Sequence, residues 1–153
     1  MRRKDRRIDD LALIEEIIGQ ARVCRLALHD LPAPYIVPMS FGYRDRTLYF
    51  HAARDGHKID LIKQNPQAGF DISIDLGDVD GGDQGCEWSV RYRSVTGHGH
   101  IVVVENVAEK RAALDRIMGQ YAEGEFFYPD EMVARTLIFK LNVESMTGKA
   151  GNV

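Results

Sequence analysis

Residues 88–104, WSVRYRSVTGHGHIVVV, decide the fold predicted for this chain. Aromatic and β-branched side chains, which are enriched in β-strands, fill this stretch almost without interruption. Gly97 and Gly99 are the expected points at which so long a strand bends or bulges. A long strand that turns a corner is typical of a small β-barrel.

Shorter stretches of strand-forming residues lie on both sides of this long strand. Alternation of apolar and polar residues, or enrichment in β-formers, predicts five further strands, at 22–28, 35–41, 47–51, 68–74 and 135–143. Turn residues at 29–34 and 42–46 separate the first three, and the acidic, glycine-rich segment 75–85 is expected to be a loop. Six strands joined mainly by hairpins favour a mainly β (α+β) fold, an antiparallel split β-barrel, over a parallel sheet.

Three helices are expected at the edges of this barrel. Asp9 or Asp10 can cap a helix whose apolar residues recur at helical spacing and which ends at Gly19. A short helix is expected from about 56 to 64, and a longer one over 107–121. The longer helix is expected to turn Ala112, Leu114, Ile117 and Met118 inward, and Glu109, Lys110 and Arg111 outward.

The composition limits the class of protein. The 153 residues, 44% hydrophobic and 28% charged, fit one globular domain over 1–153 and exclude disordered and low-complexity chains. A net charge of −3 gives no overall field to attract a polyanion, so nucleic acid is not the expected partner. We find no apolar run of membrane-spanning length, no secretory signal and too few cysteines for a disulfide framework. A cytoplasmic protein without a membrane partner is therefore expected.

The stretch 49–58, YFHAARDGHK, carries the clearest chemical signal. A strand ends at His51, two small residues follow, and a glycine then opens a helix with Lys58 in its first turn. The backbone N–H groups of a helix N-terminus carry partial positive charge, so this arrangement suits a phosphate ester, and Arg54 adds a second cation. The alternative is an ordinary strand-turn-helix with solvated cations.

Two side chains near this stretch could serve a ligand. An imidazole at the end of a barrel strand can donate to a ligand or act as an acid near neutral pH, so His51 is a candidate catalytic residue. Its alternative role is a structural hydrogen bond. Pro38 lies in mid-strand, where it removes a ladder donor and leaves neighbouring backbone groups free for a flat heteroaromatic ring. The alternative there is an edge strand protected from aggregation.

No metal site is predicted. His98 and His100 alternate along a strand and face one side, but no Cys-x-x-Cys, His-x-x-x-His or carboxylate cluster accompanies them. Cys24 lies inside an apolar strand and is expected to be a core residue. Cys86 lies beside an acidic loop with no cation to activate it, so neither cysteine is an expected nucleophile.

Taken in order, several segments resemble the pyridoxamine 5′-phosphate oxidase-related flavoproteins, and most of all their branch of 5-nitroimidazole antibiotic resistance proteins. The main segments are VCRLA at 23–27, PYIVPMSFGY at 34–43, LYFHAA at 48–53 and YRSVTGHG at 92–99. The likeness continues through GHKIDLI at 56–62 and TGK at 147–149, so it covers nearly the whole chain.

This resemblance implies an FMN-binding split barrel that forms a homodimer, with two equivalent flavin clefts between the protomers. It implies that the strand at 35–41 offers backbone groups to the isoalloxazine ring, that Lys58 pairs with the phosphate and that His51 lies beside the flavin. Trp88, a residue type favoured in buried interfaces, is a candidate contribution from the partner. The cofactor-binding residues expected on this basis are Val37, Pro38, Met39, His51, Ala52, Lys58, Ser94 and Trp88.

Two classes of function follow from the sequence. The first is an FMN-dependent oxidoreductase, similar to nitroimidazole reductases, that passes electrons from reduced flavin to a small acceptor such as a nitroaromatic. The second is a flavin- or haem-binding module without turnover, with His51 or His98 as an axial ligand. A barrel that binds single-stranded nucleic acid is disfavoured by the net charge. Vitamin B6 oxidation is also disfavoured, because 140–153 lacks the arginine and histidine that hold the substrate phosphate in pyridoxamine oxidases.

Overall fold

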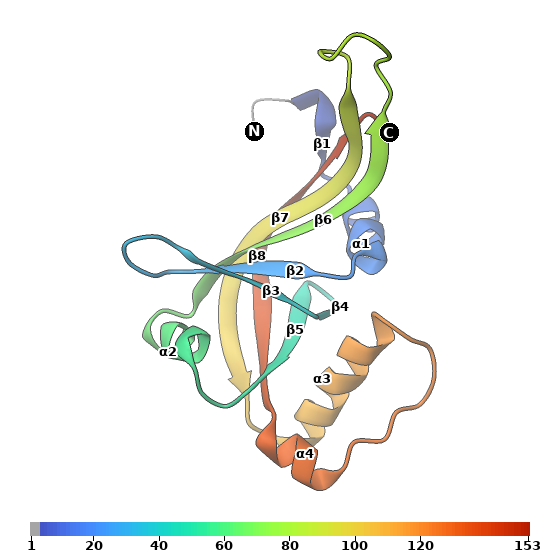
Figure 1. Ribbon diagram of the computed structural model, residues 1–153. Helices are drawn as coiled ribbons and strands as arrows, with labels where there is room; N and C mark the ends of the chain where they lie inside the picture. Colours follow the sequence, from blue (N-terminus) through green and yellow to red (C-terminus); the bar gives the residue numbers. More distant parts are fainter. Residues whose placement is uncertain (1–3) are drawn as a thin grey trace.

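An eight-stranded antiparallel sheet dominates the computed structural model, which describes residues 4–153 (Figure 1). The strands follow the order β3-β2-β6-β7-β8-β5-β4 across the sheet, and β1 pairs with β8. The strands are β1 (Arg7–Ile8), β2 (Cys24–Leu28), β3 (Tyr35–Met39), β4 (Gly42–Arg44), β5 (Thr47–Ala52), β6 (Gln67–Val79), β7 (Ser89–Val104) and β8 (Leu137–Gly151). The helices are α1 (Leu11–Gln20), α2 (His57–Gln64), α3 (Val107–Gly119) and α4 (Asp130–Arg135), after a 3-10 turn at Lys4–Arg6. The order is open between β3 and β4, as a split barrel requires.

The six predicted strands are confirmed, the structure adds the short strands β1 and β4, and several strand ends differ. Gly42–Arg44, expected in a turn, is strand β4, and the turn itself is limited to Asp45 and Arg46, both with positive φ. β6 continues to Val79, within the expected loop, because its last residues still pair with β7 after a register shift. β8 continues to Gly151 because it pairs with β7 along nearly its whole length.

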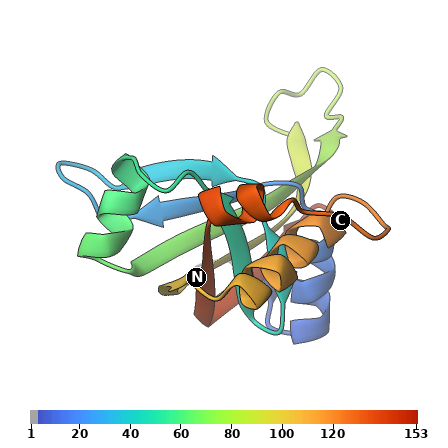
Figure 2. The same cartoon turned by 90° about the horizontal axis from the view of Figure 1, so that it is seen from below.

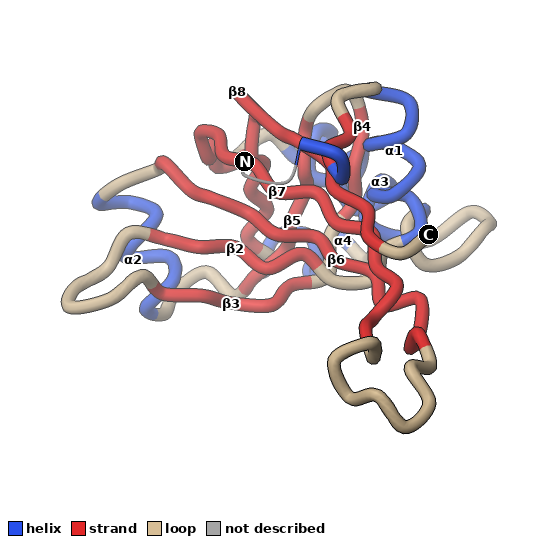
Figure 3. Tube along the Cα trace, turned by 90° about the horizontal axis from the view of Figure 1, so that it is seen from above, coloured by secondary structure: helices blue, strands red, loops and turns tan. Residues whose placement is uncertain are grey.

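The long strands β6, β7 and β8 form the twisted frame of the sheet (Figures 1 and 3). The pairing of β7 with β8 shifts register between His98 and Gly99, which confirms the bend predicted there. Beyond this frame the β6–β7 hairpin projects away from the remaining strands, and its loop carries the exposed Cys86 (Figure 3).

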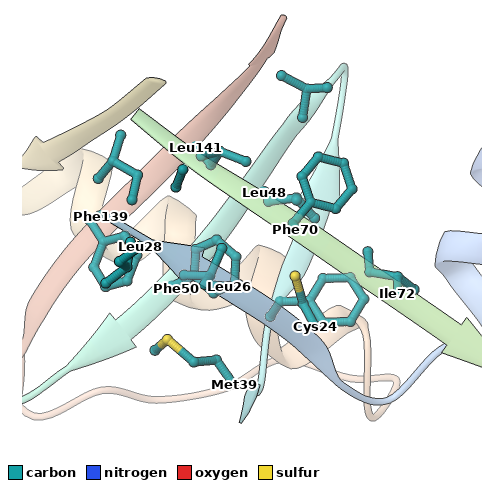
Figure 4. Packing of buried hydrophobic residues seen from close by; sticks show 14 of the residues in the cluster. Cys24, Leu26, Leu28, Met39, Leu48, Phe50, Phe70, Ile72, Phe139 and Leu141 are labelled. Carbon is teal, nitrogen blue, oxygen red and sulfur yellow. The ribbon is translucent and has the colours of Figure 1, made fainter. Parts of the chain in front are cut away.

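The hydrophobic core fills the inside of the curled sheet (Figure 4). Phe50 of β5 stacks on Phe139 of β8 with ring centroids 5.2 Å apart, and Leu26 and Phe70 from β2 and β6 are also buried. Cys24 is completely buried in this cluster, and burial raises the pKa of its thiol. Its predicted role as a core residue is confirmed.

Helices α1 and α3 cover two parts of the sheet. Asp10 caps α1 by accepting from the backbone N–H groups of Ala12 and Leu13, as predicted. In α3 the buried residues are Lys110, Ala113 and Ile117. The prediction was wrong for Lys110 and for Ala112, which are buried and exposed respectively.

The Lys110 side chain is buried because its ammonium group donates to the carbonyl of Thr136, 3.0 Å away, at the junction of α4 and β8. A local helical pattern carries no information about such a distant acceptor. The six-residue helix α4 was itself not predicted. None of the helices within residues 4–153 is long and apolar enough to cross a membrane.

The C-terminal end of α3 is fixed to the barrel by a dense polar corner. The Gln120 amide donates to the carbonyls of Ile18 and Ala21, both at 2.8 Å. The Tyr121 hydroxyl accepts from the Phe41 N–H and donates to the Arg22 carbonyl, both at 2.9 Å. This corner holds α1, α3 and the link between β3 and β4 together.

Candidate functional site

The turn between β5 and α2 is rich in unpaired hydrogen-bond donors. Gly56 caps α2 with a φ of 115°, a left-handed conformation that favours glycine, and no side chain caps the helix. Within residues 4–153, the backbone N–H groups of His57 and Lys58 have no acceptor, and the half-buried Lys58 side chain has no hydrogen-bond or ion-pair partner. These donors and the helix dipole together suit an anion.

Arg54 in the same turn is used differently from the sequence-based expectation. Its guanidinium donates to the carbonyl of Ala134 in α4 at 2.7 Å. The turn that carries Lys58 is thereby tied to α4, and Arg54 serves as a structural link between these two segments.

Strand β3 lies against the start of α2. The rings of Tyr35 and His57 meet edge to face with centroids 5.1 Å apart, and the His57 Nε2 lies 2.7 Å from the Asp30 carboxylate. This hydrogen bond and one from the Leu31 N–H lower the pKa of Asp30. No local pattern predicts this pair, since 26 residues separate His57 from Asp30.

The residues expected from β3 lie along one edge of the sheet. β3 is an edge strand, and within residues 4–153 its outer edge pairs with no other strand. Pro38 is exposed, Val37 is half-buried and Met39 is buried in the core. Val37 and Ala52 are partly buried, and both pack against the hydrophobic core.

His51 lies at the end of β5 on the face opposite the buried Phe50. Its Cα is the cross-strand partner of Ile138 in β8. The imidazole is exposed and, in the described part of the chain, has no hydrogen-bond or ion-pair partner. It therefore has no structural hydrogen bond to lose and is available to a ligand.

A single chain does not bring Ser94 and Trp88 to this region. Ser94 lies opposite Ser73 and Lys149 in the upper part of the sheet. Trp88 is 49% exposed and donates its indole N–H to the Gly82 carbonyl at 2.9 Å, within the projecting β6–β7 loop. Figure 1 shows this loop at the top of the molecule and α2 far below it at the left. Only a second chain could place these two residues beside the first chain's Lys58.

The histidines considered as metal ligands are not clustered. His98 is 3.9 Å from the Glu144 carboxylate in an exposed ion pair. Among residues 4–153, no group of three or more histidine, cysteine, aspartate or glutamate side chains is placed to hold a metal ion.

Comparison with known proteins supplies the context for this geometry. The family model that matches, over residues 10–150, is described as pyridoxamine 5′-phosphate oxidase. A solved structure of a candidate 5-nitroimidazole antibiotic resistance protein from Bacteroides thetaiotaomicron is 39% identical, with a TM-score of 0.81, over 94% of this chain and 86% of that one. No curated protein matches the sequence.

Two more distant structures share the fold. A flavocytochrome from Azotobacter vinelandii is 15% identical with a TM-score of 0.86, over 100% of this chain and 72% of that one. A FAD- and heme-binding protein from Mycobacterium smegmatis is 20% identical with a TM-score of 0.80, over 97% and 74% of the respective chains. At these identities the likeness concerns the fold alone.

Proposed function

This chain belongs to the pyridoxamine 5′-phosphate oxidase family, and on that premise we propose that it is an FMN-dependent oxidoreductase that passes electrons to a small acceptor such as a nitroaromatic. The observation that carries the proposal is the turn before α2, close to the edge strand β3, where Lys58 and the first helical N–H groups have no partner among residues 4–153. The 39% identity to the candidate 5-nitroimidazole resistance protein from Bacteroides thetaiotaomicron supports the class of acceptor.

The residues at this turn fit the flavin phosphate and ring. The Lys58 ammonium and the N–H groups of His57 and Lys58 would hold the phosphate. The backbone at Val37, Pro38 and Met39 would meet the ring edge, because β3 has no strand partner on its outer side within residues 4–153. FMN, when bound, supplies the electron transfer itself.

His51 is the proposed catalytic side chain. Its imidazole is exposed at the end of β5, next to Ala52 and the turn that carries Lys58. An imidazole without an internal partner can hold a proton at one ring nitrogen and offer it to a bound acceptor near neutral pH. His51 would in this way orient and protonate the acceptor.

We also propose a cytoplasmic homodimer. A two-fold interface would cover the free β3 edge, with Ile36 on it 63% exposed, and would bring Ser94 and Trp88 to the partner's cleft. The unpaired cysteines suit a reducing compartment. Light scattering of the flavin-loaded protein at micromolar concentration should give twice the 17.3 kDa chain mass, and the mass of one chain would count against the dimer.

A second candidate function is a flavin- or haem-binding module without turnover. It is supported by the structural likeness to a flavocytochrome and to a FAD- and heme-binding protein. The exposed His51 and His98 are the side chains that could serve as axial ligands.

An absorption spectrum and mass spectrometry of the small molecule that co-purifies separate these functions. Flavin bands with an FMN mass support the first proposal, whereas a Soret band supports the haem module. The flavin-loaded protein is then photoreduced without oxygen and mixed with nitroaromatics, quinones and pyridoxamine phosphate. Rapid reoxidation by a nitroaromatic is the expected result. Failure of every acceptor to react faster than with free FMN would leave the non-catalytic module.

A further inference from the structure

A cleft of about 370 Å³ lies between α3 and the outer face of the sheet, away from the turn before α2. The helix contributes Glu109, Ala112, Ala113 and Arg116, whose i, i+3, i+4, i+7 spacing places them on one face. Tyr49 and Lys140, which are cross-strand partners on β5 and β8, form part of the opposite wall. Figures 1 and 2 show α3 lying along this side of the sheet.

The cleft exists because α3 is fixed on both sides of two alanines. Towards its C-terminal end the helix touches β4, where a Cβ added at Gly42 would lie 2.4 Å from the backbone carbonyl group of Arg116. Towards its N-terminal end, Lys110 holds the helix to the Thr136 carbonyl. Between these contacts Ala112 and Ala113 are too small to fill the space above Tyr49, so the hollow is built into the fold.

Charged side chains of opposite sign lie at different points along the cleft. Arg116 lies at the end next to the β4–β5 turn, and Glu109 lies seven residues away, roughly 10 Å along the helix axis. Lys140 lines the opposite wall, across from Tyr49 on the neighbouring strand. Within residues 4–153 the side chains of Arg116, Lys140 and Glu109 have no hydrogen-bond or ion-pair partner, whereas Arg44 is paired with Asp45 at 3.1 Å.

From this arrangement we propose that the cleft binds a small aromatic carboxylate with a hydrogen-bond donor on the far side of its ring, as in 4-aminobenzoate. The carboxylate would lie at Arg116 and Lys140, because arginine and lysine form charge-assisted hydrogen bonds with carboxylates. The ring would pack on Tyr49, Ala113 and Val104, and its donor would face Glu109. The volume falls within the range of small-molecule sites.

This site is separate from the proposed flavin site, since none of its lining residues belongs to β3, to the turn before α2 or to α2. Tyr49 nevertheless precedes His51 by two residues and shares its face of β5. A ligand in the cleft would thus lie on the same side of the strand as the proposed catalytic histidine. Binding does not depend on whether the protein carries a flavin.

The test is a calorimetric titration in which 4-aminobenzoate is added to the purified protein. The protein is used with the flavin that co-purifies with it. Saturable binding at one site per chain is expected, with weaker binding of benzoate and of aniline, which each lack one of the two polar groups. Lys140→Gln and Arg116→Gln should each weaken binding by roughly 10-fold or more. Ala112→Leu should abolish it, because the exposed helical position can accept leucine while the added side chain fills the cleft.

Arg135→Gln is the matched control, because it removes an exposed positive charge outside the cleft and should bind as the wild type does. Circular dichroism establishes that each variant is folded. The proposal is overturned if no saturable binding occurs in the millimolar range, or if Ala112→Leu and Lys140→Gln bind as tightly as the wild type. A ligand-induced change in the flavin spectrum that survives in Ala112→Leu would place binding at the flavin and would also overturn it.

Discussion

Two polar regions of this molecule use similar groups in opposite ways. At the C-terminal corner of α3, Gln120 and Tyr121 donate to or accept from backbone groups of distant segments. Around the turn from β5 to α2, His51, Lys58 and the first helical N–H groups lack such partners within residues 4–153. The first region holds the chain together, and the second is left available to a ligand.

The difference teaches how a polar group's role can be recognised from its partners. Folded proteins satisfy most of their buried hydrogen-bonding groups internally, so a satisfied corner contributes to stability. A cluster of accessible donors without an internal acceptor contributes little to folding and is free to bind a ligand. Changes in the two regions should therefore separate stability from cofactor binding and turnover.

The largest effect is expected from His51→Ala. Loss of a positioned acid typically costs 10²- to 10⁴-fold in rate, so reoxidation of the photoreduced protein by a nitroaromatic should slow by about that factor. Because His51 has no internal partner in the described chain, the dimer and its flavin should be retained. Stopped-flow absorbance at several pH values measures the rate. An unchanged rate with a normal flavin spectrum would leave His51 as a ring-packing residue.

Near the C-terminal corner of α3, Gly42→Ala should lower the stability of the protein most. The added Cβ would lie 2.4 Å from the carbonyl carbon and oxygen of Arg116, so backbone must move. Overpacking of this kind costs about 3 kcal/mol in the free energy of unfolding, measured by urea denaturation.

Gly119→Ala is the control for this change. It lies at the end of the same helix, and a Cβ there would meet nothing within 4 Å. Alanine has the higher helix propensity, so this variant should be as stable as the wild type or slightly more stable. Equal stability of the Gly42 and Gly119 variants would contradict the close contact between α3 and β4.

Lys58→Ala directly tests the group of unpaired donors before α2. A charge-assisted hydrogen bond contributes about 1.5–3 kcal/mol, so the dissociation constant for FMN should rise roughly 10- to 150-fold. The free energy of unfolding of the apoprotein should hardly change, since Lys58 has no partner in residues 4–153. Lys63→Ala, at the other end of α2, should bind FMN normally. If both variants bind alike, the phosphate lies elsewhere.

The smallest effect is expected at Asp30, whose bond to His57 ties the start of α2 to the β2–β3 loop. The folded-state pKa of Asp30 lies below its ordinary 3.8, so its stabilisation is present above that pH and is lost as the pH falls through the folded value. Asp30→Asn should lower the thermal midpoint slightly near neutral pH, and the difference from wild type should vanish in acid. A difference that grows in acid would have the wrong sign.

Most of the fold could be predicted because most of its elements depend on residues that are close together in the sequence. The capping by Asp10, the strand β5 and the start of α2 near Gly56 depend on residues close in sequence. β4 was missed because Gly42 and its neighbours have turn character, and only the close approach of α3 explains a glycine there. The burial of Lys110 likewise depends on the carbonyl of Thr136, which no helical pattern includes.

In the candidate site, too, the positions set by local sequence were predicted and those set by distant contacts were not. The positions of His51 and Lys58, at a strand end and in a first helical turn, follow from local sequence and were predicted correctly. The use of Arg54 to hold Ala134 could not be predicted, because α4 itself was not. The flavin roles of Ser94 and Trp88 stay predictions, since they require a geometry between two chains.

The two cysteines differ in exposure, so the native chain offers one accessible thiol for covalent labelling. Cys24 is sealed in the core with a raised thiol pKa, whereas Cys86 is exposed on the projecting β6–β7 loop. Alkylating reagents react with accessible thiolates, so a nitroxide should attach to the native chain at one position only. In an assembly of two chains, pulsed electron spin resonance would then measure a single distance between the two loop tips. The separation of these loops can be measured without first engineering the sequence.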